Sequence, residues 1–298
     1  MKRTTKVWLG VGVCIMAGSG ALPPSDPHAA ARTLLSSSAL TDPGATASAA
    51  QHVVRIAHHH RKTVKAKPAR EGGEGEAGAR SGESALAPDL DFALKIAQIR
   101  GHLLVGDELV QQGQWNGAYP HFRHPTEELY GPIRGRLKEY QTPPFEAALQ
   151  VLANQVKRRK GGDDYAGALK AVTEALDAAD QGVKAKQEDW NSFRIEVVLE
   201  LLKSATEEYQ GAIVNGRIAK PVEYQDARGF VWQADRMVES MAPALERKNA
   251  DALKQVRAAL AELKQTWPAA MPPKTPVKDY GAVLGDVSRI ELAAGKLM

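Results

Sequence analysis

Residues 119–130, YPHFRHPTEELY, hold two histidines and two glutamates that could bind a metal ion. His124 and Glu127 are three residues apart, which places both on one face of a helix, a spacing used for metal ligands in helical bundles. The same residues also suit a helix start. Pro125 favours the first helical position, Glu127 would be stabilised by the helix dipole, and His124 would be the N-cap. Both interpretations of His124 remain open. His102, which precedes this stretch, is expected to be a half-buried, hydrogen-bonded side chain.

A second group of carboxylates lies in residues 208–227, EYQGAIVNGRIAKPVEYQDA. At about 100° per residue, Glu208 points to the apolar face of one expected helix and Glu223 to that of the next, with Asp226 at its margin. Asn215-Gly216 predicts a turn that joins the two helices, so both glutamates should lie at the same end of a hairpin. Since a buried unpaired carboxylate is costly, we expect an Arg or Lys partner, access to water, or a cation, held together with a histidine from residues 119–130.

The elements that position these groups are predicted to be helices, because apolar residues recur at spacings of three and four from Asp89 onward. Gly106, Ala118 and Phe122 have the spacing of one tetratricopeptide unit, and a single copy predicts only a tight helical hairpin. The sequence therefore predicts an all-α fold, an antiparallel bundle of up-down helices that starts with this hairpin. The expected helices cover residues 89–113, 115–122, 125 onward, 143–160, 163–180, 190–215, 221–245, 249–266 and 279–297.

The charge distribution argues against a nucleic-acid-binding function. The formal net charge is +4, but residues 1–88 carry +5 and residues 89–298 carry −1. The folded part therefore lacks the basic surface of a nucleic-acid-binding domain. We find no nucleophile triad, zinc-protease helix motif or phosphate loop, so we do not expect an enzyme.

The N-terminus has the pattern of a secretory signal peptide. Residues 1–6 are basic, residues 7–17 are apolar but too short to span a bilayer, and small residues follow at 19–21. We expect cleavage after residue 21, or as late as residue 31, and a periplasmic protein without a transmembrane helix. An uncleaved anchor and a lipoprotein are the alternatives. Cleavage would remove Cys14, the single cysteine, and with it any thiol chemistry.

Residues 22–88 are predicted to form a disordered basic linker, because they lack the apolar residues that a packed core needs. The run His58-His59-His60 within it is either a solvated basic patch or a metal-binding tract. Residues 89–266 should form the helical bundle. Residues 267–298 should form a proline-rich linker and a C-terminal helix that packs on the bundle.

Residues 205–231 resemble the soluble periplasmic helical region of bacterial high-affinity iron permeases. This chain has no membrane-spanning helices after the signal and no Arg-Glu-x-x-Glu iron motif, so the resemblance implies a free-standing relative of the extracytoplasmic region. The segment 101–133 is similar to an exported family of proteobacteria. His124 and Glu127 are similar to the Gly-x-His-x-x-Glu motif of imelysin-like proteins, although the glycine is missing. The positions that carry the permease resemblance are Glu208, Tyr209, Ala212, Ile213, Gly216, Glu223, Tyr224, Asp226 and Phe230.

We therefore predict a periplasmic helical-bundle protein that binds a divalent or ferric metal ion, with iron favoured, or that assists an iron-uptake system. An iron permease or another envelope protein would be its partner. The alternative is a ligand-free structural or interaction module of the cell envelope, in which Arg or Lys residues pair with the inward glutamates. The predicted metal ligands are Glu208, Glu223, Asp226, His124 and Glu127.

Overall fold

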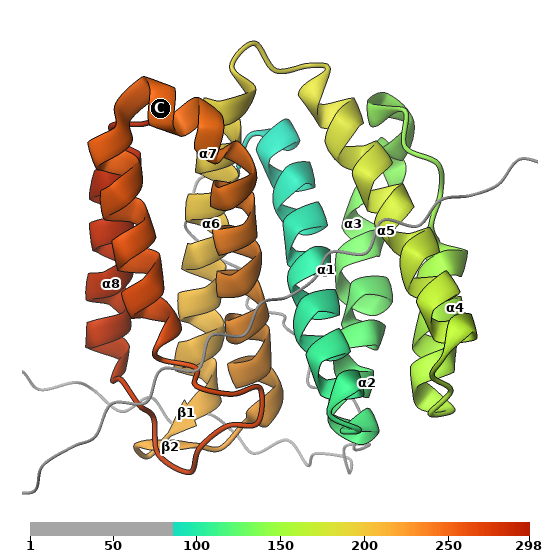
Figure 1. The fold of residues 1–298 in the computed structure, drawn as a ribbon. Helices are drawn as coiled ribbons and strands as arrows, with labels where there is room; N and C mark the ends of the chain where they lie inside the picture. Colours follow the sequence, from blue (N-terminus) through green and yellow to red (C-terminus); the bar gives the residue numbers. More distant parts are fainter. Residues whose placement is uncertain (1–85) are drawn as a thin grey trace, which may run out of the picture. The chain divides into compact units, whose positions relative to one another are not determined.

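The computed structural model describes residues 86–298, and the predictions for residues 1–85 lie outside this part. The described part is helical except for one two-stranded hairpin, which confirms the all-α prediction (Figure 1). The helices are α1 (Pro88–Gln111), α2 (Trp115–His124), α3 (Tyr130–Ile133), α4 (Glu146–Lys157), α5 (Asp163–Lys184), α6 (Trp190–Ala212), α7 (Pro221–Lys264) and α8 (Tyr280–Ala294). A π-helical turn (Pro125–Leu129) follows α2, and a 3-10 helix (Arg134–Tyr140) follows α3.

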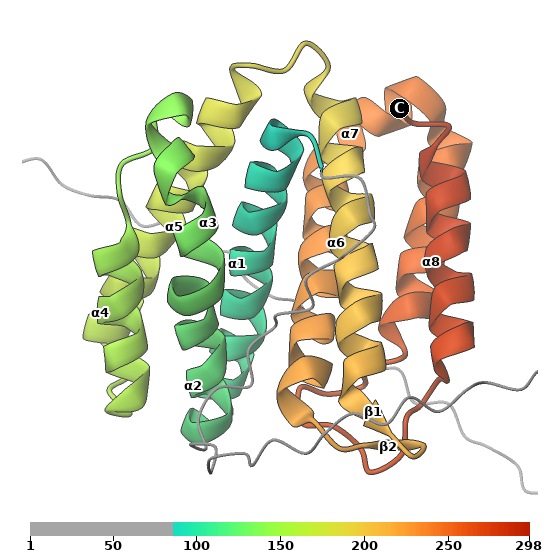
Figure 2. The ribbon, with the colours of Figure 1, turned by 180° about the vertical axis from the view of Figure 1, so that it is seen from behind.

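Helix α1 lies between two groups of helices: the first consists of α2 to α5 and the second of α6 to α8 (Figure 2). It contacts α2 and α5 on one side and α6 and α7 on the other. The residues that recur at spacings of three and four from Phe92 to Val110 are buried, and so are residues on other faces, such as Leu94 and Val105. A helix with neighbours on several sides buries more than one stripe.

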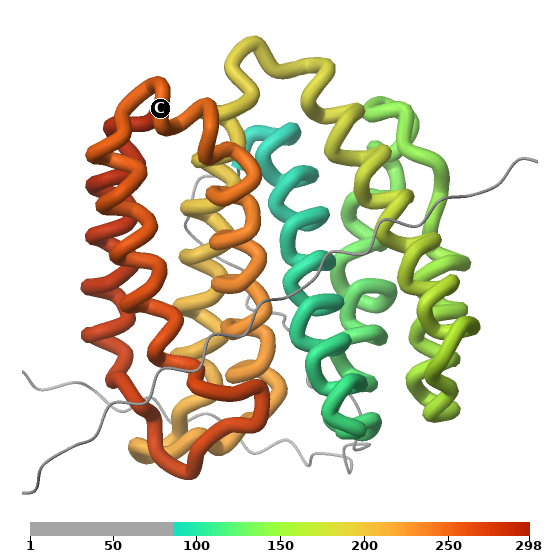
Figure 3. The backbone as a smooth tube through the Cα atoms, viewed as in Figure 1, coloured from blue at the N-terminus to red at the C-terminus, as the bar shows by residue number. Residues whose placement is uncertain are grey.

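The second group consists of α6, α7 and α8, and α7 is divided by a kink at Asn249 (Figure 3). Asn249 has an extended backbone, φ −163° and ψ 95°, and its Oδ1 accepts a hydrogen bond from the backbone N–H of Ala252 at 3.0 Å. It therefore caps the second part of α7. Ion pairs between Arg257 and Glu239 and between Lys264 and Asp235 show that this part folds back along the first. The predicted break between residues 245 and 249 is confirmed.

A short hairpin joins α6 to α7. Strand β1 (Ile213–Val214) pairs with β2 (Arg217–Ile218), and Asn215 and Gly216 both have positive φ, 51° and 71°. Two such residues between paired strands form a type I′ turn, which Asn-Gly favours. The turn is where the sequence predicted it. Helix α6 ends at Ala212, three residues before the predicted end, because the following two residues pair as a strand.

Glycines allow the helices around α1 to approach closely. A Cβ atom added to Gly229 of α7 would lie 2.3 Å from the carbonyl oxygen of Gly101 in α1. One added to Gly106 would lie 2.7 Å from the ring of Phe122 in α2. Only glycine permits such close contact with a backbone or an aromatic ring of a neighbouring helix. The tight hairpin predicted from Gly106 and Phe122 is therefore present, and α7 crosses α1 on another face.

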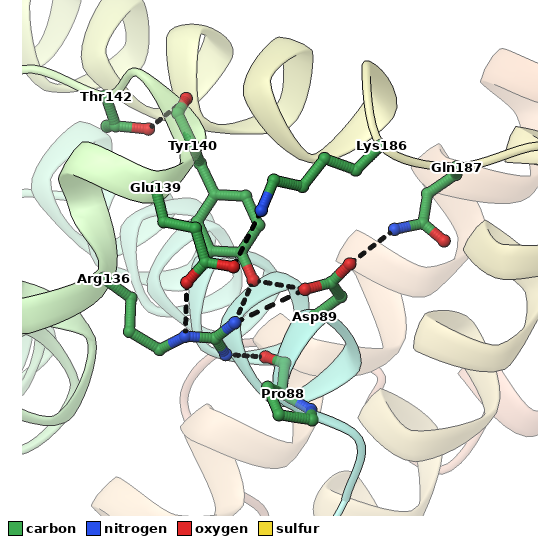
Figure 4. A network of polar contacts seen from close by, with 8 residues as sticks. All are labelled: Pro88, Asp89, Arg136, Glu139, Tyr140, Thr142, Lys186 and Gln187. Carbon is green, nitrogen blue, oxygen red and sulfur yellow. Dashed lines mark hydrogen bonds and ion pairs between the residues drawn. The ribbon is translucent and has the colours of Figure 1, made fainter.

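A polar network fastens the start of α1 to the 3-10 helix and to the turn after α5 (Figure 4). The Asp89 carboxylate accepts hydrogen bonds from the Tyr140 hydroxyl at 2.6 Å and from the Gln187 amide at 2.9 Å. Arg136 contacts both Asp89 and Tyr140. The Tyr140 hydrogen bond is the largest influence on Asp89 and holds the pKa of its carboxyl below 3.8. The network therefore includes an ionised carboxylate at neutral pH.

Candidate metal centre

Three histidines surround one buried aspartate where α1, α2 and α7 meet. His102 comes from α1, His121 and His124 from α2, and Asp226 from α7. The exposed fractions are 0% for His102 and His121, 7% for His124 and 1% for Asp226. The Gly101–Gly229 contact lies one residue from His102 and three from Asp226. The close helix crossing therefore brings the two side chains together.

His121 holds Asp226 in place. Its Nδ1 lies 2.7 Å from Asp226 Oδ1, and its Nε2 lies 2.9 Å from Oε1 of Gln225. The ring either carries a charge and donates to both oxygens, or donates to Asp226 and accepts from the Gln225 amide in its other orientation. In both arrangements the two ring nitrogens are engaged. His121 is therefore a positioning residue for the carboxylate.

His102 is different, because neither of its ring nitrogens makes a hydrogen bond of normal geometry among the described residues. Its Nδ1 nevertheless lies 2.7 Å from Asp226 Oδ1. The ring of Phe230 stands edge-on to it, with 5.1 Å between centroids. Within residues 86–298, His102 Nε2 has no partner of either kind, and leaving a buried polar nitrogen without a partner is costly. A cation shared with Asp226 would satisfy it.

His124 completes the cluster. Its Nδ1 lies 3.8 Å from Asp226 Oδ2, and potential ligand atoms of His102, His124 and Asp226 all lie within 4.8 Å of one another. Ligand atoms bound to one ion at about 2.1 Å would be about 3.0–3.4 Å apart. The His102–Asp226 pair, at 2.7 Å, is slightly closer than this range. The His124–Asp226 pair, at 3.8 Å, is slightly farther apart. Some pairs of ligand atoms are up to 4.8 Å apart, so the three side chains fit a metal ion only after shifts of up to about 1.4 Å.

The Asp226 carboxylate stays ionised in this setting. Burial by itself raises its pKa, but the positive charge of His102 and His121 outweighs burial and holds the pKa well below 3.8. The cluster thus offers an anionic oxygen beside imidazole nitrogens, which is a donor set that suits first-row transition metals.

An irregular turn follows His124 directly. Pro125 has no backbone N–H, and the N–H of Tyr130 bonds to the carbonyl of Pro125, five residues back, which closes a π-helical turn. His124 itself has helical angles, φ −52° and ψ −42°, and makes no capping hydrogen bond. The interpretation of His124 as an N-cap is therefore wrong, because α2 continues through Pro125. Single π turns often accompany functional sites.

Two of the five predicted ligands, His124 and Asp226, lie in the cluster. Asp226, expected at the margin of its helix's apolar face, is fully buried. Glu127 is 52% exposed and pairs with Arg123. Glu223 pairs with Lys220 at 3.1 Å.

Glu208 is half-buried near the end of α6 and is not part of the buried His–Asp group. His102 was expected to be half-buried and is fully buried. His102 and His121 were not among the five predicted ligands, although His121 lies in the stretch 119–130 that was a candidate for metal binding. Gly101 and Gly229, which flank the crossing, were the available signal.

No helix in residues 86–298 combines the length and the apolar composition needed to cross a membrane. None of the curated proteins and none of the solved structures compared matches the chain. One family model matches, that of the iron permease-associated 4-helix bundle domain, over residues 184–298. That range contains α6, the two parts of α7 and α8, which make four helical segments. Residues 184–298 therefore resemble the iron permease-associated four-helix bundle domain, which confirms the resemblance predicted from residues 205–231.

Proposed function

We propose that this protein is a metal-binding helical-bundle protein of the periplasm that serves an iron-uptake system. The observation that carries the proposal is the convergence of His102, His124 and Asp226, all buried, with His102 Nε2 lacking a partner among the described residues. His121 orients the carboxylate as an outer partner, an arrangement common around metal ligands. The family match supplies the connection to iron permeases.

The site would belong to both groups of helices. Asp226 and Gln225 lie within the range that resembles the permease-associated domain, whereas the three histidines come from α1 and α2, outside it. A metal ion here would tie the permease-like helices to the rest of the described chain. An iron permease, or another envelope protein, is the partner that we propose.

Binding rather than catalysis fits the site. His102 and Asp226 are 0% and 1% exposed, which leaves no surface on which a substrate could meet them. We therefore propose that the protein is not an enzyme.

Metal titration of the purified protein tests the proposal. After treatment with a chelator, the protein should bind one metal ion per chain, measured by calorimetry and by elemental analysis. His102→Ala and Asp226→Asn should each weaken binding by about 100-fold or more. Glu127→Gln is the matched control, because this exposed glutamate lies one turn from His124, and it should bind like the wild type. The proposal is wrong if no metal binds above background, or if Asp226→Asn binds normally.

The second candidate function is a ligand-free structural or interaction module. The pairing of Glu223 Oε1 with Lys220 and the hydrogen bonds of His121 favour it, since these atoms have partners within the protein. It predicts that the melting temperature is the same with and without a chelator. A metal-bound protein should instead melt at a higher temperature than its chelated form.

A further inference from the structure

We propose that the His102–His124–Asp226 site selects a divalent ion and discriminates against ferric iron. The inference rests on the proposed metal-binding function and goes beyond it, because the residue types alone left a divalent and a ferric ion equally open. Three features of the site decide between them: the donors, the charge and the surroundings.

The donors are mainly neutral nitrogens. Two imidazole rings and a single carboxylate converge, and His121 is engaged with Asp226 Oδ1 and Gln225. Imidazole suits Fe²⁺, Zn²⁺, Cu²⁺ and Ni²⁺. Ferric iron is a harder ion that is held best by several anionic oxygens. Only one such group is in the cluster.

The net charge of the site also favours a divalent ion. Asp226 supplies one negative charge. With His102 and His124 bound as neutral ligands and His121 in its neutral form, a divalent ion leaves a net charge of +1 in the buried site and a ferric ion leaves +2. The cost of burying an ion rises with the square of its charge, so +2 costs roughly four times as much as +1. Glu127 is on the surface, and Glu223 is held by Lys220. Neither carboxylate joins the buried group.

The surroundings keep this cost high. His102, His121 and Asp226 have almost no exposed surface, and the Phe230 ring packs edge-on against His102. The Gly101–Gly229 contact, one residue from His102 and three from Asp226, brings the backbones of α1 and α7 together beside the site. Water therefore does little to screen an excess charge there.

The geometry of the carboxylate also favours few bonds to the ion. His121 contacts Oδ1 of Asp226, and His102 lies at the same oxygen, whereas Oδ2 is the oxygen nearer to His124. With Oδ1 partly used by His121, the carboxylate cannot offer both oxygens fully to a ferric ion.

Competitive titrations of the purified full chain test the inference. Under anaerobic conditions we would measure the affinities for Fe²⁺, Zn²⁺ and Co²⁺, and separately for Fe³⁺ supplied as its nitrilotriacetate complex. Wild type should bind the divalent ions at least about 100-fold more tightly than Fe³⁺. The visible spectrum of bound Co²⁺ should show nitrogen ligation, which His102→Ala should alter.

A charge-changing variant makes the test sharper. His102→Asp replaces a neutral nitrogen donor with a second carboxylate and should shift the preference toward Fe³⁺ by about 10-fold or more. His124→Asp makes the same change at the ligand on α2, and it serves as the test variant if His102→Asp does not fold. Glu127→Asp is the matched control, since it lies outside the cluster and should leave the preference unchanged.

The outcomes separate the two proposals. If wild type binds no metal, both fail. If Fe³⁺ binds as tightly as Fe²⁺ or more tightly, and Asp226→Asn abolishes that binding, metal binding stands and the divalent selectivity is wrong. If neither aspartate variant changes the preference, the charge argument is wrong as well.

Discussion

Replacing Gly229 with alanine should both destabilise the protein and loosen the metal site. The new Cβ atom would lie 2.3 Å from the carbonyl oxygen of Gly101, and real Cβ atoms essentially never come closer than 3.0 Å. The obstacle is backbone, which cannot rotate away, so α1 and α7 must separate by about 0.7 Å locally. That shift would lengthen the 2.7 Å contact between His102 Nδ1 and Asp226 Oδ1.

The magnitude follows from two opposing effects. Overpacking costs about 3 kcal/mol, at the upper end of its usual range because backbone must move. Alanine is a better helix former than glycine by about 1 kcal/mol. The free energy of unfolding should therefore fall by about 2 kcal/mol.

Two assays check this prediction. Equilibrium unfolding in urea gives the free energy of unfolding, and calorimetric titration gives the affinity for Zn²⁺ or Fe²⁺. Gly167→Ala in α5 is the matched control, because a Cβ there meets nothing within 4 Å. It should stabilise the protein by about 1 kcal/mol and leave metal binding unchanged. If Gly229→Ala is as stable as the wild type and binds metal equally well, the close crossing does not position the site.

The remaining predictions concern other parts of the molecule. At pH 7, Asp89→Asn should lower the free energy of unfolding by about 1 kcal/mol, because it weakens the hydrogen bond from Tyr140. Because the folded pKa of Asp89 is depressed, this contribution is complete above the unfolded pKa of about 3.9. It should disappear as the pH falls through the folded pKa, and a constant difference in urea unfolding between pH 7 and pH 3 would contradict this. His121→Asn should weaken metal binding by about 10-fold to 100-fold while the Co²⁺ spectrum keeps its shape, since the ligands themselves remain. A spectrum like that of His102→Ala would instead make His121 a ligand. Glu223→Gln should change the free energy of unfolding by less than about 1 kcal/mol, because its Lys220 partner is largely exposed. It should leave metal affinity unchanged. A large loss of affinity in the titration would show that Glu223 is a metal ligand.

Local sequence determined much of the fold. Apolar spacing predicted most of the helices, and Asn215-Gly216 marked the turn between α6 and α7, because both residues tolerate positive φ. The break near residue 249 was also visible, since Asn caps the second part of α7. These are properties of a few neighbouring residues. They do not depend on what lies elsewhere in the chain.

The site was only partly predictable, because it depends on residues that are far apart in the sequence. Helical phasing shows which way Glu208 and Glu223 point on their own helices, but not which neighbour they meet. Glu223 points to Lys220 near the start of α7, whereas Asp226, three residues later, points to His102 and His121. Those histidines lie more than 100 residues earlier in the chain. Their convergence depends on how closely α1, α2 and α7 can pack, and only the tertiary structure, through its glycine contacts, decides that distance.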